Sequence, residues 1–241
     1  MIGIVALHPF SRRKTVFVSS ILARLALLLM VCTVWGCKSR DVGPDDSRSD
    51  FIVGWGDSLT EGSPSTSTYL AELEKLTGTT YTYINRGISG QTSSQVAERM
   101  LADTKKHSYN TIIWVGRNNL LYPEQIKADI AAMVAALGHD RYLVLGMING
   151  DFDTNEQVFT QRHQSIMQLN GDLYKTYGDH YVNIHAYLLS QYDPTKAQDI
   201  IDHTYDVVPS SLRVDKLHLN LLGNQKVAQR IQQSLSVLTH Q

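Results

Sequence analysis

Two short segments near opposite ends of the chain hold residue types that can perform nucleophilic catalysis together. The first is Gly56-Asp57-Ser58-Leu59-Thr60, which follows an apolar run, and the second is Asp215-Lys216-Leu217-His218. A carboxylate and an imidazole three residues apart can meet within one turn, and such a pair can activate a serine hydroxyl. The sequence therefore predicts Ser58 as a nucleophile, His218 as its general base and Asp215 as the residue that orients the base.

The Gly-Asp-Ser string has an ordinary structural interpretation as well. Asp and Ser side chains bond to nearby backbone groups in turns, so the string alone is a weak signal of catalysis. Asp57 is open to two interpretations, a free catalytic carboxylate or a brace for the turn, and we favour the brace. The presence of a base and an orienting carboxylate elsewhere in the chain is what favours an active site.

Glycines and amides follow two more apolar runs. Residues 85–92 read Asn-Arg-Gly-Ile-Ser-Gly-Gln-Thr, and residues 116–119 read Gly-Arg-Asn-Asn. Glycine lets the backbone come close to a ligand, and an amide side chain can donate a hydrogen bond. Because open α/β sheets bind ligands outside the carboxyl ends of their strands, we expect both loops to lie on the same edge of the sheet as Ser58.

Apolar runs alternate with segments of helical length along the chain. The runs are almost continuously apolar, as strands buried on both faces are; they span residues 51–55, 81–85, 111–116, 142–148 and 180–184. Apolar residues recur at helical spacing twice, at Ile126, Ile130, Met133, Val134 and Leu137, and at Val227, Ile231, Leu235 and Leu238. The alternation predicts an α/β fold, a three-layer α/β/α sandwich, in one domain over residues 51–241.

The N-terminal segment predicts an export signal. Residues 12–14 are Arg-Arg-Lys, and the apolar run Leu25 to Trp35 ends at Gly36-Cys37. A basic region, a short apolar run and a small residue before the cleavage point are typical of secretory signals. The ending resembles the lipobox of bacterial lipoproteins, in which the cysteine is lipidated and becomes the mature N-terminus. We expect residues 1–37 to be this signal, Cys37 the lipid attachment site, and residues 38–50 a polar tether.

An uncleaved transmembrane anchor is the alternative for this segment. Residues 16–35 are long enough to cross a bilayer at about 1.5 Å per residue. Arg24 lies in the middle of that stretch, and a charge near the bilayer centre costs about 2.5 to 3.5 kcal/mol on insertion scales. The lipoprotein interpretation is therefore favoured. It predicts an exported protein that is anchored to a membrane and faces the periplasm or the cell exterior.

Composition argues against several kinds of partner. The formal net charge is -1 and no long basic stretch occurs outside the N-terminus, so no nucleic-acid partner is expected. The two cysteines, Cys32 and Cys37, both precede the domain, which therefore has no disulfide and no thiolate metal ligand. The histidines show no His-Glu-x-x-His spacing. We expect a monomer that needs no metal and no organic cofactor.

Taken together, these segments resemble the GDSL esterases and lipases of the SGNH hydrolase superfamily. Four blocks stand in the family's order between Phe51 and about Leu238: Gly56-Asp57-Ser58-Leu59, then Gly90, then Gly116-Arg117-Asn118, and finally Asp215 with His218. The resemblance implies a flavodoxin-like parallel sheet of five strands in the order 2-1-3-4-5. It also implies an oxyanion hole made of the backbone N–H groups of Ser58 and Gly90 and the side-chain amide of Asn118.

Asn119 departs from the family's pattern, which usually has aspartate after the asparagine. The departure leaves the inferred oxyanion donor Asn118 in place. It leaves open how the loop is held and which of the two asparagines points toward the reacting centre.

The resemblance implies serine-dependent hydrolysis of carboxylic esters through an acyl-enzyme in the bacterial cell envelope. Small acyl esters, lysophospholipids and O-acetylated glycans are all compatible substrates. Two alternatives stay open: an acyltransferase on envelope glycans, which uses the same acyl-enzyme, and a non-catalytic binding lipoprotein on the same fold. The intact set of candidate site residues favours a catalyst, because a decayed site would usually have lost one of them.

Overall fold

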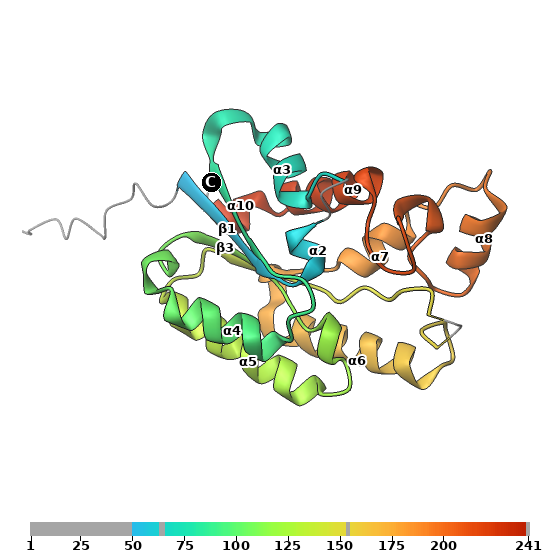
Figure 1. The fold of residues 1–241 in the computed structure, drawn as a ribbon, viewed down its shortest axis with the longest axis horizontal. Helices are drawn as coiled ribbons and strands as arrows, with labels where there is room; N and C mark the ends of the chain where they lie inside the picture. The colour runs from blue at the N-terminus through green and yellow to red at the C-terminus, as the bar shows by residue number, and fades with distance from the viewer. Residues whose placement is uncertain (1–49, 63–65, 153–154, 240–241) are drawn as a thin grey trace, which may run out of the picture. The chain divides into compact units, whose positions relative to one another are not determined.

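Five parallel strands form one sheet, with helices on both of its faces (Figure 1). The computed structural model describes residues 50–62, 66–152 and 155–239. The strands are β1 (Phe51–Gly56), β2 (Thr82–Gly87), β3 (Asn110–Trp114), β4 (Tyr142–Leu145) and β5 (Tyr181–Val182). Their order is β2-β1-β3-β4-β5, and every neighbouring pair is parallel. The expected three-layer sandwich and strand order are confirmed.

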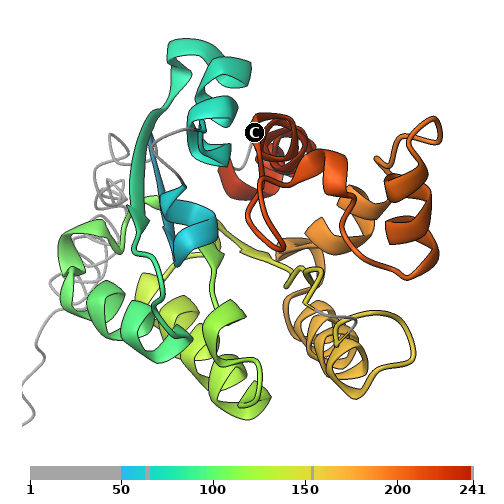
Figure 2. The same cartoon turned by 45° about the vertical axis from the view of Figure 1, so that its right-hand side comes forward.

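The helices form the two outer layers. They are α2 (Ser58–Glu61), α3 (Tyr69–Thr77), α4 (Ser93–Ala102), α5 (Pro123–Leu137), α6 (Gln161–Tyr177), α7 (Ile184–Leu189), α8 (Ala197–Thr204), α9 (Leu221–Gln232) and α10 (Leu235–Thr239). Short 3-10 turns lie between helices and strands, among them η2 (Gly78–Thr80), η3 (Thr104–Lys106), η4 (Arg117–Asn119), η5 (Gly178–His180) and η6 (Ser210–Leu212). Figure 2 shows α4 and α5, in green, on the opposite side of the sheet from α3 and α9.

The helix boundaries follow from side-chain capping. Thr92 starts α4 by accepting from the backbone N–H of Gln95, whose side chain accepts from the backbone N–H of Thr92 in return. Asn220 starts α9 by accepting from the N–H of Gly223. The left-handed Gly138 ends α5, as is common where a helix stops.

The core lies on both faces of the central strands. Ile112, Ile113 and Trp114 of β3 are almost wholly buried, as are Ile52 and Val53 of β1. Because helices cover both faces, successive residues of these strands are buried instead of alternating. The edge strand β2 is only partly buried.

Two expected elements differ from those observed. The run at residues 180–184 forms only two strand residues, because the side chain of Asn183 accepts from the N–H of Ala186 and starts α7 there. The helical repeat over residues 227–238 is interrupted between α9 and α10, although Val227 and Leu238 both reach the core.

The signal, the lipid attachment site at Cys37 and all but the last residue of the tether lie outside the described residues. In the part of the chain that the structure describes, none of the helices combines the length and the apolarity needed to cross a membrane.

Candidate active site

Ser58 lies at the junction of β1 and the short helix α2. The carboxylate of Asp57 accepts a hydrogen bond of 3.0 Å from the N–H of Leu59, which makes Asp57 the N-cap of α2 and Ser58 its first residue. The turn is tightly packed against the end of β2, because a Cβ atom added to Gly87 would lie 2.0 Å from the backbone nitrogen of Glu61. Only glycine fits there, and the position of Ser58 is set by this packing.

His218 and Asp215 complete a chain of hydrogen bonds with Ser58. The Oγ atom of Ser58 is 2.9 Å from Nε2 of His218, and Nδ1 of the same ring is 2.8 Å from Oδ2 of Asp215. The side chains of His218 and Asp215 are 41% and 52% exposed. With one ring nitrogen bound to a carboxylate, the other is directed at the hydroxyl, which is the arrangement that removes a proton from serine.

The carboxylate of Asp215 is held in its ionised form. Partial burial acts to raise its pKa, but hydrogen bonds from the N–H of Leu217, from the His218 ring and from the N–H of His218 outweigh burial and hold the pKa below its usual value. The two N–H bonds measure 2.8 and 2.6 Å and end on Oδ1, so Oδ2 faces the ring. Asp215 is therefore a negative charge beside the imidazole, as an orienting residue requires.

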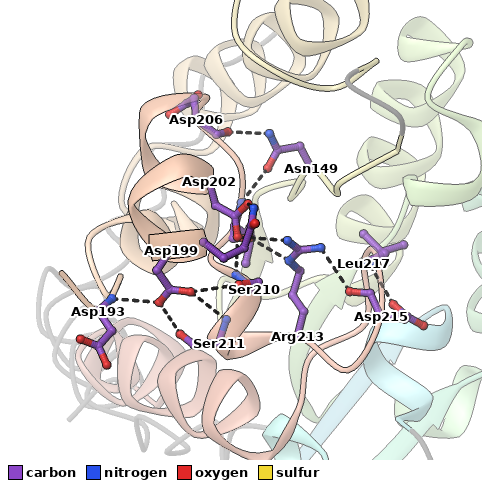
Figure 3. A network of polar contacts seen from close by, with 12 residues as sticks. Asn149, Asp193, Asp199, Asp202, Asp206, Ser210, Ser211, Arg213, Asp215 and Leu217 are labelled. Atoms are coloured by element: carbon purple, nitrogen blue, oxygen red, sulfur yellow. Dashed lines mark hydrogen bonds and ion pairs between the residues drawn. The ribbon is translucent and has the colours of Figure 1, made fainter. Parts of the chain in front are cut away.

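A buried arginine holds the loop that carries Asp215 (Figure 3). Arg213 donates from Nη1 to the carbonyl of Asp215 at 3.1 Å, from Nε to the carbonyl of Val208 at 2.8 Å, and from Nη2 to the carboxylate of Asp202 at 3.3 Å. Arg213 is 8% exposed and Asp202 is 4% exposed. The guanidinium thus ties the loop to α8, which carries Asp202.

A second carboxylate of α8 fixes the turn η6, just before Arg213. Asp199 is fully buried and accepts from the hydroxyls of Ser210 and Ser211, from the N–H of Ser211 and from the N–H of Asp193 (Figure 3). Buried carboxylates are stable only when their oxygens are satisfied in this way. The segment from Ser210 to Asp215 is therefore anchored by side chains of one helix.

The loop after β2 lies beside the loop after β3. Gly90 has a φ of +78°, a conformation that favours glycine. Gln91 follows Gly90 in the chain, and its carbonyl accepts a 2.8 Å hydrogen bond from the side-chain amide of Asn118. Arg99 donates from Nε to the side chain of Gln91 at 2.7 Å and reaches the carbonyls of Gly56 and Arg86 through Nη2. The three segments inferred to form the oxyanion hole are thus cross-linked.

The side chain of Asn119 bonds to the first residue of α4. Its Oδ1 accepts from the N–H of Ser93 at 3.1 Å, and its Nδ2 donates to the hydroxyl of Ser93 at 2.9 Å. The Ser93 hydroxyl donates in turn to Asp129 of α5 at 2.6 Å. Asn119 therefore connects its loop to α4 and α5. This is how the loop is held where asparagine replaces the family's usual aspartate.

Asp57 is buried beneath the site, at 1% exposure. Burial raises its pKa from the usual 3.8 to about 6, while the N–H of Leu59 and the positive charge of Arg117 act in the opposite direction. A buried carboxyl that caps α2 is a structural brace, and this geometry favours that interpretation over a free catalytic carboxylate.

Two cavities border these residues. One of about 610 Å³ is lined by Ser58, Asp215 and His218 together with Glu61 and Val214. The other, of about 340 Å³, lies against Asn118 and Leu217. Within the described ranges no group of three His, Cys, Asp or Glu side chains could hold a metal ion.

Sequence reasoning missed Arg213, Asp202 and Arg99, and it missed the contacts of Gln91 within its loop. The only signal for Arg213 was its place two residues before Asp215, and the others stand in helices and loops without a distinctive spacing.

Comparison with known proteins agrees with this architecture. The GDSL-like Lipase/Acylhydrolase family model matches residues 55–226. No curated protein matches the chain. Among solved structures, a GDSL-like lipase from Bacteroides thetaiotaomicron is 18% identical, with a TM-score of 0.58, over 89% of this chain and 96% of that one.

Two esterase structures are similar as well. An acetyl xylan esterase is 18% identical, with a TM-score of 0.58, over 77% of this chain and 99% of that one. A catalytic mutant of an acetylxylan esterase from Geobacillus stearothermophilus is 15% identical, with a TM-score of 0.55, over 77% of this chain and 94% of that one. At these identities the similarity shows the fold, whereas the family match covers most of the chain. The chain belongs to the GDSL-like lipase/acylhydrolase family of SGNH hydrolases and is an ester-hydrolysing enzyme.

Proposed function

We propose that this enzyme hydrolyses carboxylic esters through an acyl-enzyme on Ser58. The observation that supports the proposal is the continuous chain of hydrogen bonds from the Ser58 hydroxyl through His218 to Asp215, at 2.9 and 2.8 Å. Ser58 comes from the end of β1, whereas His218 and Asp215 come from the loop before α9. The pattern is that of a nucleophile, a base and an orienting acid.

The first half of the reaction forms the acyl-enzyme. Nε2 of His218 takes the proton of Ser58 as Oγ attacks the ester carbonyl carbon, and the ionised Asp215 stabilises the resulting imidazolium. The tetrahedral intermediate collapses when the bond to the alcohol oxygen breaks and His218 gives the proton to that oxygen. The alcohol leaves, and the acyl group stays on Ser58.

Water completes the reaction. It loses a proton to His218, attacks the acyl carbon and releases the carboxylic acid, while the proton returns to Oγ of Ser58. The partial exposure of His218, at 41%, supports access of water to the acyl-enzyme.

The oxyanion is held by the N–H groups of Ser58 and Gly90 and by the amide of Asn118. An amide nitrogen has two hydrogens, and one of those of Asn118 is donated to Gln91. That bond fixes the side chain and leaves the second hydrogen for the oxyanion. Donors fixed in place before the reaction each contribute about 2.7 to 4 kcal/mol to the transition state.

Acylated glycans are the substrate class that we favour. Two similar structures are acetyl xylan esterases, and the cavity of about 610 Å³ beside His218 has room for a bulky alcohol such as a sugar. Lysophospholipids and small acyl esters are the other candidates.

Labelling with a fluorophosphonate tests the nucleophile. We expect one adduct on Ser58, located by peptide mass spectrometry, and none in the Ser58→Ala variant. An adduct on a different serine, or none on a folded protein, would contradict the assignment. Release of acetate from acetylated xylan, beside aryl esters of increasing acyl length, tests the substrate class.

A further inference from the structure

The smaller of the two cavities carries charged side chains that the reaction itself does not use. It has a volume of about 340 Å³ and is lined by the proposed oxyanion donor Asn118 and by Leu217, which precedes His218. It shares no lining residue with the cavity of about 610 Å³ that contains Ser58 and His218. The two cavities are therefore distinct, and Asn118 and Leu217 place the smaller one beside segments of the proposed active site.

The position of the base assigns one side of the ester to each cavity. His218 must reach the oxygen of the leaving alcohol to protonate it, and His218 lines the larger cavity but not the smaller one. The alcohol therefore occupies the larger cavity. The acyl side of the ester then faces Asn118, which lines the smaller cavity, here named the acyl cavity.

A buried ion pair forms the floor of this acyl cavity. Nη2 of Arg117 lies 2.8 and 2.9 Å from the two carboxylate oxygens of Glu156, and the two side chains are 7% and 0% exposed. Glu156 also accepts from the N–H of Gly150 at 2.8 Å. Nε of Arg117 is buried and has no hydrogen-bond partner among the described residues.

Arg162 brings a second guanidinium to the same carboxylate. Its Nη1 is 3.7 Å from Glu156, and its side chain is 44% exposed. Among the described lining residues, two arginines and one glutamate leave one net positive charge. The carboxylate of Glu156 is paired with the buried Arg117 at short distance. Arg162 is farther from Glu156 and more exposed, so its positive charge is the one available to a ligand at the cavity rim.

Part of the remaining wall is apolar. Leu120, Leu121 and Phe152 line the cavity, and the guanidinium of Arg117 lies 5.2 Å from the centre of the Phe152 ring. The methylene groups of an acyl chain can be buried against such a wall. An anionic group at the end of the chain can form a charge-assisted hydrogen bond with Arg162 at the rim.

We propose that the acyl cavity selects acyl chains that end in a carboxylate, so that the preferred substrates are half-esters of dicarboxylic acids. The inference rests on the proposed function of Ser58. The methylene groups lie along Leu120 and Phe152, and the terminal carboxylate pairs with Arg162. Hydrolysis consumes water and releases the alcohol and the dicarboxylic acid.

The test compares two aryl esters of equal length on the full-length protein. One is the half-ester of adipic acid, and the other is the ester of adipamic acid, in which a neutral amide replaces the terminal carboxylate. We expect kcat/KM to be about fivefold higher for the acidic ester at low ionic strength, as for one partly exposed ion pair, and the preference to shrink as salt is added.

Substitutions of Arg162 locate the effect. Arg162→Gln should remove the preference and Arg162→Glu should invert it, as measured by the ratio of kcat/KM for the two esters. Lys105→Gln, which removes an exposed charge on η3, should leave the preference intact. A third ester, with its carboxylate on the alcohol part, should show no dependence on Arg162.

Failure of the subsite is distinguishable from failure of the proposed function. If wild type hydrolyses both esters at equal rates, or if Arg162→Gln slows both equally, catalysis by Ser58 stands and the carboxylate subsite is overturned. If hydrolysis of the third ester, with its carboxylate on the alcohol part, also depends on Arg162, the carboxylate subsite is overturned as well. If neither ester is hydrolysed and Ser58 takes no fluorophosphonate, the proposed function is wrong and the subsite falls with it.

Discussion

Asn118 and Asn119 are neighbours with different partners, which makes their roles separable by mutation. Asn118 is exposed and donates to the carbonyl of Gln91, whereas Asn119 bonds twice to Ser93. If Asn118 stabilises the oxyanion, Asn118→Ala lowers kcat by about 10² to 10³ with little change in KM, because the bond strengthens only in the transition state. Steady-state kinetics with an aryl ester measures this.

Asn119→Ala is the matched control. Loss of its bonds to Ser93 should cost about 1 kcal/mol of unfolding free energy and have a smaller effect on turnover. Thermal denaturation of both variants provides the contrast. If Asn119→Ala abolishes turnover while Asn118→Ala stays near normal, the oxyanion donor has been assigned to the wrong residue.

The buried carboxyl of Asp57 predicts a pH dependence of stability. Its pKa is about 6 in the folded protein, against 3.8 ordinarily, mainly because of burial. The folded state thus holds this proton more tightly than the unfolded state, so ionisation of Asp57 costs stability as pH rises from about 4 to above 6. Asp57→Asn removes that cost, and relative to wild type it should gain about 1 to 3 kcal/mol between pH 4 and pH 7.

Urea denaturation at several pH values measures the difference. Other titrating groups are common to both proteins and cancel. The quantity compared is the unfolding free energy of Asp57→Asn minus that of wild type. If this difference is constant between pH 4 and pH 7, or falls as pH rises, Asp57 is ionised in the folded protein at low pH and the prediction is wrong.

At the scale of elements, α8 supports the loop that carries Asp215 and His218. Arg213→Met removes the bonds to the carbonyls of Asp215 and Val208 and leaves the buried Asp202 without its cation. Removing one partner of such a pair costs about 3 to 5 kcal/mol. We expect that loss in denaturation experiments, together with a lower kcat at a temperature where the variant is still folded.

A double variant tests the mechanism of this loss. Adding Asp202→Asn to Arg213→Met should recover part of the stability, because no unpaired charge remains. Arg230→Met, which removes a surface arginine bonded to Gln233, should change neither stability nor kcat appreciably. Equal effects of the two arginine substitutions would contradict a supporting role for Arg213.

The elements that could be predicted from the sequence are those determined by burial. Ile112, Ile113 and Trp114 are consecutive and apolar because β3 is covered on both faces. The end of β5 could not be predicted, because it depends on one side chain, Asn183, that caps the next helix.

The candidate site divides in the same way. Ser58, Asp215 and His218 were predictable because their chemistry requires those residue types, and the structure places them in contact. The supporting arginine was not predictable, because arginines are mostly exposed and its partner Asp202 lies on another element, 11 residues away in the chain.

At the scale of the whole molecule, Cys37 is the residue that we predict to determine where the enzyme acts. We predict that it is lipidated, because Gly36-Cys37 closes an apolar run of signal length. Cys37→Ser should move the protein from the detergent fraction to the soluble fraction, and mass spectrometry of the wild type should find lipid on the N-terminal peptide. A variant that stays membrane-bound and uncleaved would instead support the transmembrane anchor.

The spacing of the triad along the chain has a consequence during synthesis. Ser58 and His218 are 160 residues apart, and ribosomes add about 5 to 20 residues per second, so roughly ten to thirty seconds separate the two residues. The last strand ends at Val182, before the base has been made. A growing chain that ends between Ser58 and His218 therefore carries the proposed nucleophile without its proposed base, and we expect it to be inactive as a hydrolase until His218 has been added.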